Sequence, residues 1–158
     1  MKKLFATIGI LVVVMGFRGI AHAQVFTAAL TGTEEVPPVD TATTGDVIIL
    51  FNAEETAAEF LLTVNAGQRV QQAHIHCGAI GVNGPVVVFL AGFHANGWDV
   101  NGPWVGNTTF SNANITDTSC GSTVAELAQA MREGMTYANV HTVAHPGGEV
   151  RGQIRPFE

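Results

Sequence analysis

The stretch that decides the fold is residues 46–65, DVIILFNAEETAAEFLLTVN, in which two apolar runs flank a short polar segment. In the second run Phe60, Leu62 and Val64 occupy every other position. This is the period of a strand that buries one of its two faces. The polar residues 52–55 between the runs are typical of a hairpin loop. The stretch therefore predicts an antiparallel hairpin packed on a core.

The chain beyond this hairpin has the same texture, with short Val-, Ile- and Phe-rich runs separated by Gly, Asn and Thr. Many short strands without intervening helices favour an antiparallel sandwich or barrel. We predict an all-β fold, an antiparallel Greek-key β-sandwich. Its strands are expected near 25–31, 46–51, 57–65, 70–77, 85–90, 103–110, 136–142 and 149–155.

One segment departs from this pattern and predicts a short helix near 123–133. Thr123 and Glu126 have the spacing of a capping box, in which the side chain of each residue accepts a hydrogen bond from the backbone N–H of the other. Leu127 and Met131 then continue an apolar stripe at helical spacing.

The N-terminus resembles a secretory signal peptide over residues 1–23. Lys2 and Lys3 precede an apolar run from Leu4 to Phe17, and an A-x-A cleavage pattern ends at Ala23. The apolar run is shorter than the roughly 18–20 residues that span a bilayer. We expect a periplasmic or secreted protein with no membrane anchor after cleavage.

Removal of residues 1–23 would leave 135 residues, 24–158, which is a natural length for a single domain. These residues contain no lysine, and 13 acidic side chains outnumber four arginines to give a net charge of −9. Nucleic-acid binding needs a basic surface, so nucleic acid is excluded as a partner. The absence of lysine also excludes Schiff-base enzymes and phosphate-loop NTPases. The oligomeric state cannot be read from these features.

Cys77 and Cys120 are the two cysteines of the chain. In an oxidising compartment such a pair most often forms a disulfide. The alternative is that the Cys77 thiolate, beside His76, binds a metal ion.

Two histidines, His74 and His76, lie as His-Ile-His within the expected strand 70–77. Alternation places both imidazoles on one face of the strand, with Ile75 turned toward the core. Neutral imidazole suits Cu, Zn, Ni or Fe, so this spacing could chelate a transition metal. The alternative is that both rings only bind neighbouring loops through hydrogen bonds.

A third histidine, His141, ends the expected strand 136–142. If that strand neighbours 70–77, a site of three histidines follows. His145 or His94 could supply a fourth ligand. The carboxylates of Glu149 and Asp99 are further candidates.

Two turn-rich stretches, 78–85 and 92–106, are long for so small a domain, and long loops often carry function. Phe93, Trp98 and Trp104 in the second stretch could bind a protein or glycan partner. They could equally fold under the loop, and exposure of both tryptophans would favour the first interpretation.

Glu149 and Arg151 alternate along the last strand and therefore share a face. We favour a cross-strand ion pair on this face. The alternative is that the Arg151 guanidinium attracts an anion to the histidines.

Four ordered blocks of the chain resemble the CHRD domain family, first described in chordin. They are FTAALTG with EVPP (26–38), AHIH with Gly78 (73–78), GVNGPV (81–86), and YANVHT followed by PGGEVRGQI (137–154). The resemblance implies a β-rich extracytoplasmic domain without an established enzymatic activity.

A weaker resemblance is to the copper site of copper/zinc superoxide dismutases, which are Greek-key sandwiches with an intradomain disulfide. It implies that His74, His76 and His141 bind copper, with zinc less favoured, and that Arg151 guides an anion. The zinc-binding loop of those enzymes is missing here. Copper binding is thus the first hypothesis. The alternatives are an adhesive module and a copper-only dismutase. The sequence does not decide whether the protein is an enzyme.

Overall fold

The computed structural model describes residues 24–157, so the expected signal peptide lies outside the described residues. The all-β class is confirmed, and all strand pairs are antiparallel. The strands are β1 (Gln24–Thr31), β2 (Thr44–Phe51), β3 (Ala57–Cys77), β4 (Val86–Ala91), β5 (Trp98–Ser111), β6 (Thr136–Thr142), β7 (Val150–Gln153) and β8 (Arg155–Pro156). Among the described residues no helix has the length and apolar character needed to cross a membrane.

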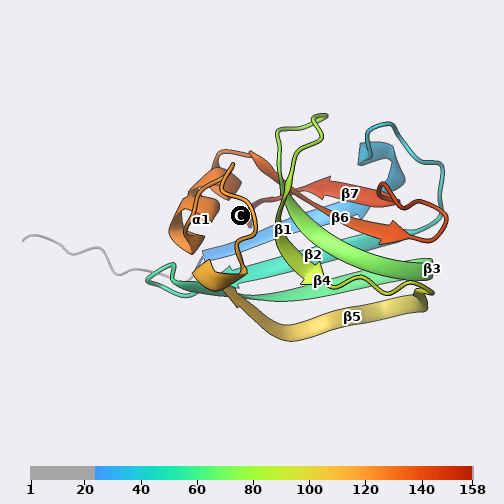
Figure 1. The fold of residues 1–158 in the computed structure, drawn as a ribbon, viewed down its shortest axis with the longest axis horizontal. Coiled ribbons are helices and arrows are strands. Elements are labelled where there is room, and N and C mark those ends of the chain that lie inside the picture. The colour runs from blue at the N-terminus through green and yellow to red at the C-terminus, as the bar shows by residue number, and fades with distance from the viewer. Residues whose placement is uncertain (1–23, 158) are drawn as a thin grey trace, which may run out of the picture.

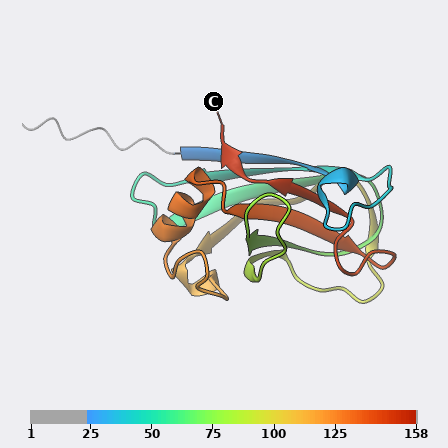
Figure 2. The same cartoon turned by 90° about the horizontal axis from the view of Figure 1, so that it is seen from above.

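The strands form one connected sheet that folds over itself into two layers (Figures 1 and 2). One layer contains β1, β2, the first half of β3 and β5. The other contains β4, the second half of β3, β6 and β7. At the far side the layers meet again where Thr31 of β1 pairs with Arg151 of β7. The core lies between the layers, with Phe26, Ile49 and Leu62 among its fully buried members.

Strand β3 differs from the sequence prediction, because the expected strands 57–65 and 70–77 are one strand that passes from one layer to the other. Ala66 and Arg69 have φ values of 53° and 50°, and the pairing with β5 shifts register on both sides of Gly67. Such bulges bend a strand without ending it. The turn-like sequence around Gly67 therefore forms a bend inside the strand.

Strand β5 also begins earlier than predicted. It starts at Trp98, so the loop predicted over 92–106 is reduced to residues 92–97. Val100 and Gly102 already pair with β3.

The predicted helix is confirmed as α1 (Val124–Arg132), which lies at one end of the two layers (Figure 1). The Thr123 Oγ1 accepts from the Glu126 N–H at 3.2 Å, and the Glu126 carboxylate accepts from the Thr123 N–H at 3.1 Å. Leu127 and Met131 are buried against the core. The predicted capping box therefore begins the helix.

The predicted disulfide between Cys77 and Cys120 is confirmed, with a Cα–Cα distance of 5.5 Å. It joins the end of β3 to the segment that leads into α1. The alternative in which a Cys77 thiolate binds a metal ion is therefore wrong for this structure.

Candidate metal centre

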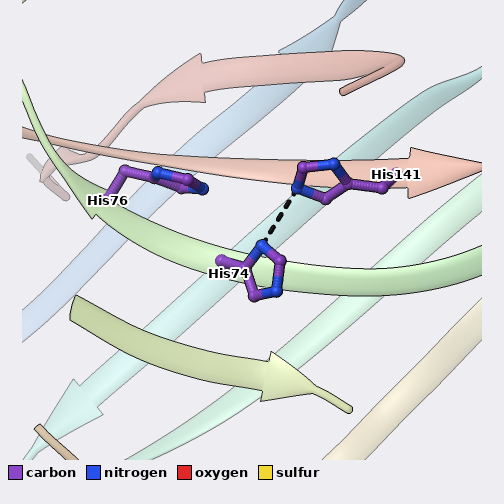
Figure 3. A group of neighbouring side chains, drawn as sticks. All are labelled: His74, His76 and His141. Carbon is purple, nitrogen blue, oxygen red and sulfur yellow. Dashed lines mark hydrogen bonds between the residues drawn. The ribbon is translucent and has the colours of Figure 1, made fainter. Parts of the chain in front are cut away.

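Three histidines come together on neighbouring strands of the second layer (Figure 3). His74 and His76 lie on β3, and the pairing of β3 with β6 places Gln72 opposite His141. Ile75 points to the other face and is fully buried in the core, as the alternation predicted. All three histidines are buried, with 4–8% of each side chain exposed. The Gly84 and Pro146 carbonyls of two loops and the Phe89 ring of β4 lie against them.

The ligand nitrogens of the three rings lie within 4.8 Å of one another. The Nδ1 of His74 and the Nε2 of His141 are 2.9 Å apart, which is a hydrogen-bond distance. The rings point toward a common region between β3 and β6 (Figure 3). The structure therefore brings together the three histidines that the sequence predicted.

Backbone carbonyls fix the orientation of two of these rings. His76 Nδ1 donates to the Gly84 oxygen at 2.8 Å, and His141 Nδ1 donates to the Pro146 oxygen at 2.9 Å. At His76 the proton on Nδ1 leaves a lone pair on Nε2. In metal proteins, histidine ligands are typically oriented in this way: the ring nitrogen that does not bind the metal donates a hydrogen bond to a carbonyl or carboxylate oxygen.

The third ring completes the hydrogen bonding of the cluster. His141 Nε2 lies 2.9 Å from His74 Nδ1 and 3.1 Å from the Asn139 Oδ1. His76 Nε2 and His74 Nε2 are buried and have no hydrogen-bond partner among the described residues. A buried polar atom without a partner is costly, and a bound metal ion would relieve that cost at His76.

The environment keeps all three imidazoles neutral. Burial, with smaller contributions from His141 and His76, lowers the pKa of His74 to about 3. Burial is also the main cause that lowers the pKa values of His76 and His141. Neutral imidazole is the form that binds a metal ion, so these rings need not lose a charge to do so.

A column of stacked side chains supports His76. Its ring stacks on Tyr137, with centroids 4.8 Å apart and planes 8° apart. The Arg151 guanidinium carbon lies 3.4 Å from the centroid of the Tyr137 ring. Tyr137 also accepts from the Gly84 N–H through its hydroxyl at 3.3 Å. Gly84 is therefore bound by both His76 and Tyr137.

Among the described residues Arg151 does not form the cross-strand ion pair that the sequence favoured. Its guanidinium donates to the Asn83 side chain and to the carbonyls of Ala79 and Val82, all in the 78–85 loop. Glu149 instead accepts from Thr41 at 2.6 Å and Thr142 at 2.5 Å. Arg151 thus holds the loop over the histidines, and an anion-guiding role stays a prediction.

The two histidines predicted as a fourth ligand lie outside the cluster. His94 stacks on Trp98, with ring centroids 3.9 Å apart. His145 belongs to the turn after β6, where its N–H donates to Thr142. Alternation along a strand predicted the ligands on β3, but nothing local indicates where a loop histidine will lie.

The carboxylates predicted as alternative ligands are occupied elsewhere. Asp99 accepts from the backbone N–H of Arg69 at 2.9 Å. Glu149 is bound to its two threonines, as described above. Neither belongs to the group of close ligand atoms.

The two tryptophans differ in exposure. Trp98 is 51% exposed, whereas Trp104 is half-buried and packs against the core. The paired exposure that would favour an adhesive loop is therefore not observed. Phe93, in the 92–97 loop before β5, is also exposed.

Several residues around the site were not found from the sequence. Asn139 lies on β6 between His74 of β3 and Arg151 of β7 in the pairing, with its Oδ1 3.1 Å from His141 Nε2. Glu35 is buried against Gly148, and burial raises the pKa of its carboxyl group. Gly84 and Pro146 act through backbone carbonyls, which no side-chain pattern can reveal.

Comparison with known proteins gives one family. A family model described as CHRD domain matches residues 26–154. No curated protein and no solved structure matches the chain.

Proposed function

The chain belongs to the CHRD domain family, and from that premise we propose that it binds a transition-metal ion, copper first, through His74, His76 and His141. The observation that carries the proposal is the orientation of the rings. His76 binds the Gly84 carbonyl through Nδ1 and leaves its buried Nε2 without a partner among the described residues, while His141 binds the Pro146 carbonyl through Nδ1 and turns its Nε2 toward His74. A purely structural pair of histidines has no need to leave a buried Nε2 without a partner.

The donor set favours copper over zinc. The three ligand atoms are neutral imidazole nitrogens, and the group contains no thiolate or carboxylate. Structural zinc sites usually take four ligands, often cysteine. Among first-row divalent ions copper binds nitrogen sites most tightly.

We also propose that the protein acts outside the cytoplasm. The signal-like residues 1–23 and the Cys77–Cys120 disulfide support this proposal, because disulfides persist in oxidising compartments. Mass spectrometry of the protein from the periplasm or medium would test it. A chain that begins near Gln24 is expected, and a cytoplasmic chain that retains residues 1–23 would contradict it.

The experiment that tests metal binding compares two double variants of the protein, expressed from the full-length sequence without a histidine tag. His74→Ala/His76→Ala removes two ligands, and His94→Ala/His145→Ala removes two histidines outside the cluster. Calorimetric copper titration should show one site in the wild type and in the second variant, and none in the first. Equal binding by both variants would overturn the proposal.

The proposal does not extend to superoxide dismutation. Arg151, which the resemblance makes an anion guide, is 2% exposed and bound to the 78–85 loop. A partner-binding role has its own support in the exposed side chains of Phe93 and Trp98. Glycan-array or pull-down binding that is lost in Phe93→Ala/Trp98→Ala but retained in His74→Ala/His76→Ala would favour that second function.

A further inference from the structure

We propose that the site formed by His74, His76 and His141 selects Cu(I) over Cu(II), and that the buried guanidinium of Arg151 sets this selectivity. The inference rests on the proposed function and names the oxidation state of its ion. Four features carry it: the charge of the ligands, their number, their burial, and an unneutralised cation next to one of them.

The ligands supply no negative charge. Each is a neutral imidazole, and the carboxylates nearest along the chain are engaged elsewhere, Glu149 by Thr41 and Thr142. Burying an ion costs free energy that grows with the square of its charge. At a site buried this deeply, a monovalent ion is therefore favoured over a divalent one.

The number of ligands favours the same ion. Cu(II) prefers a square-planar or tetragonal set of nitrogen and oxygen ligands. Among the described residues only three ligand side chains converge, because His94 and His145 lie outside the group. The filled d shell of Cu(I) imposes no such geometry, so it accepts three nitrogens.

Arg151 adds a positive charge that no ion pair neutralises. Its guanidinium binds neutral acceptors in the 78–85 loop, and no carboxylate within the described range lies at salt-bridge distance from it. Glu35 is the buried acid that interacts with this charge over a longer range. The guanidinium therefore disfavours any further positive charge nearby.

The stacked column brings this charge close to a ligand. Arg151 lies on Tyr137 and Tyr137 stacks on His76, so only one aromatic ring separates the guanidinium from an imidazole. The field of the guanidinium would therefore oppose the second positive charge of Cu(II) at His76.

The test measures both affinities for the wild type and three variants. Cu(I) binding is measured without oxygen by competition with bicinchoninate, and Cu(II) binding by competition with nitrilotriacetate. We expect the wild type to bind Cu(I) at least 100-fold more tightly than Cu(II). In Arg151→Gln the ratio of the Cu(I) affinity to the Cu(II) affinity should fall about tenfold. This change corresponds to a reduction potential about 59 mV lower for the bound Cu(II)/Cu(I) couple.

Two variants separate charge from loop anchoring. Arg151→Lys keeps the charge and should keep the ratio. Asn83→Ala removes one anchor of the loop but leaves the charge, so its ratio should equal that of the wild type. A ratio that does not change in Arg151→Gln, or that falls equally in Asn83→Ala, would overturn the assignment to Arg151.

The wild type alone decides the selectivity, even if Arg151→Gln does not fold. Cu(II) binding as tight as Cu(I) binding would overturn the inference while metal binding stands. Failure of the wild type to bind either ion would instead overturn the proposed function.

Discussion

The Nδ1 of His74 and the Nε2 of His141 lie 2.9 Å apart, although 67 positions separate the two residues in the sequence. In the metal-free protein a proton occupies the space between these nitrogens. A metal ion that uses the His141 lone pair must displace this hydrogen bond. The geometry therefore couples metal binding to the protonation state of the cluster.

The stability of the metal-free protein should fall in acid. An unfolded histidine has a pKa of about 6.5, whereas burial lowers the pKa of folded His74 to about 3. Between these values the unfolded chain binds more protons, so stability is complete above about pH 6.5 and is lost toward pH 3. Between its unfolded and its folded pKa, each of the three histidines should make the free energy of unfolding fall by up to about 1.4 kcal/mol for each pH unit of acidification.

Urea unfolding at pH 7 and pH 5 measures this slope. His74→Gln removes one buried histidine and should show a smaller loss between the two pH values. The prediction is contradicted if both proteins lose the same free energy of unfolding.

Gly84→Ala should weaken metal binding. A Cβ at this position would lie 1.6 Å from the Cys77 carbonyl oxygen, so the loop backbone must move. The same residue supplies the carbonyl that orients His76. Loss of such an outer partner typically costs 10–100-fold in metal affinity, and we expect this range by calorimetric titration.

Gly92→Ala is the matched control for Gly84→Ala, because nothing lies within 4 Å of a Cβ built at Gly92. Its metal affinity and stability should equal those of the wild type. A similar loss of affinity in both variants would show that the Gly84 carbonyl has no special role.

Ile75→Val should separate stability from binding. Ile75 lies between two ligands in the sequence but is fully buried on the opposite face of β3. Removal of one buried methyl group should cost about 0.5–1.5 kcal/mol of unfolding free energy. The metal affinity should stay within twofold of the wild type, and a larger change would mean that the two faces of the strand are not independent.

Removal of the disulfide should destabilise the fold strongly. Cys77 and Cys120 are 43 positions apart, and closing a loop of this length is worth about 4 kcal/mol in the chain-entropy account. We expect Cys77→Ala/Cys120→Ala to lose about 2–4 kcal/mol in urea unfolding. Unchanged stability would show that the segment before α1 is held by packing alone.

The strands and the three clustered histidines could be predicted because alternation is a local property. His74 and His76 share a face by their spacing, and His141 follows from the neighbouring position of β3 and β6. The continuity of β3 could not be predicted, since residues 66–69 look like a turn, and it is the pairing of Gly67 with Val100 of β5 that keeps them in the strand. The contacts of Arg151 were missed for a similar reason, because its partners are backbone carbonyls of a distant loop.

The division of the ligands between β3 and β6 has a consequence for the order of assembly. During synthesis from the N-terminus, His74 and His76 emerge long before His141 and the Pro146 carbonyl that orients it. An ion captured at that stage would have only a two-nitrogen chelate. The three-histidine cluster exists only after β6 has paired with β3, so the proposed loading with metal would follow closure of the sheet and would report a correctly folded chain.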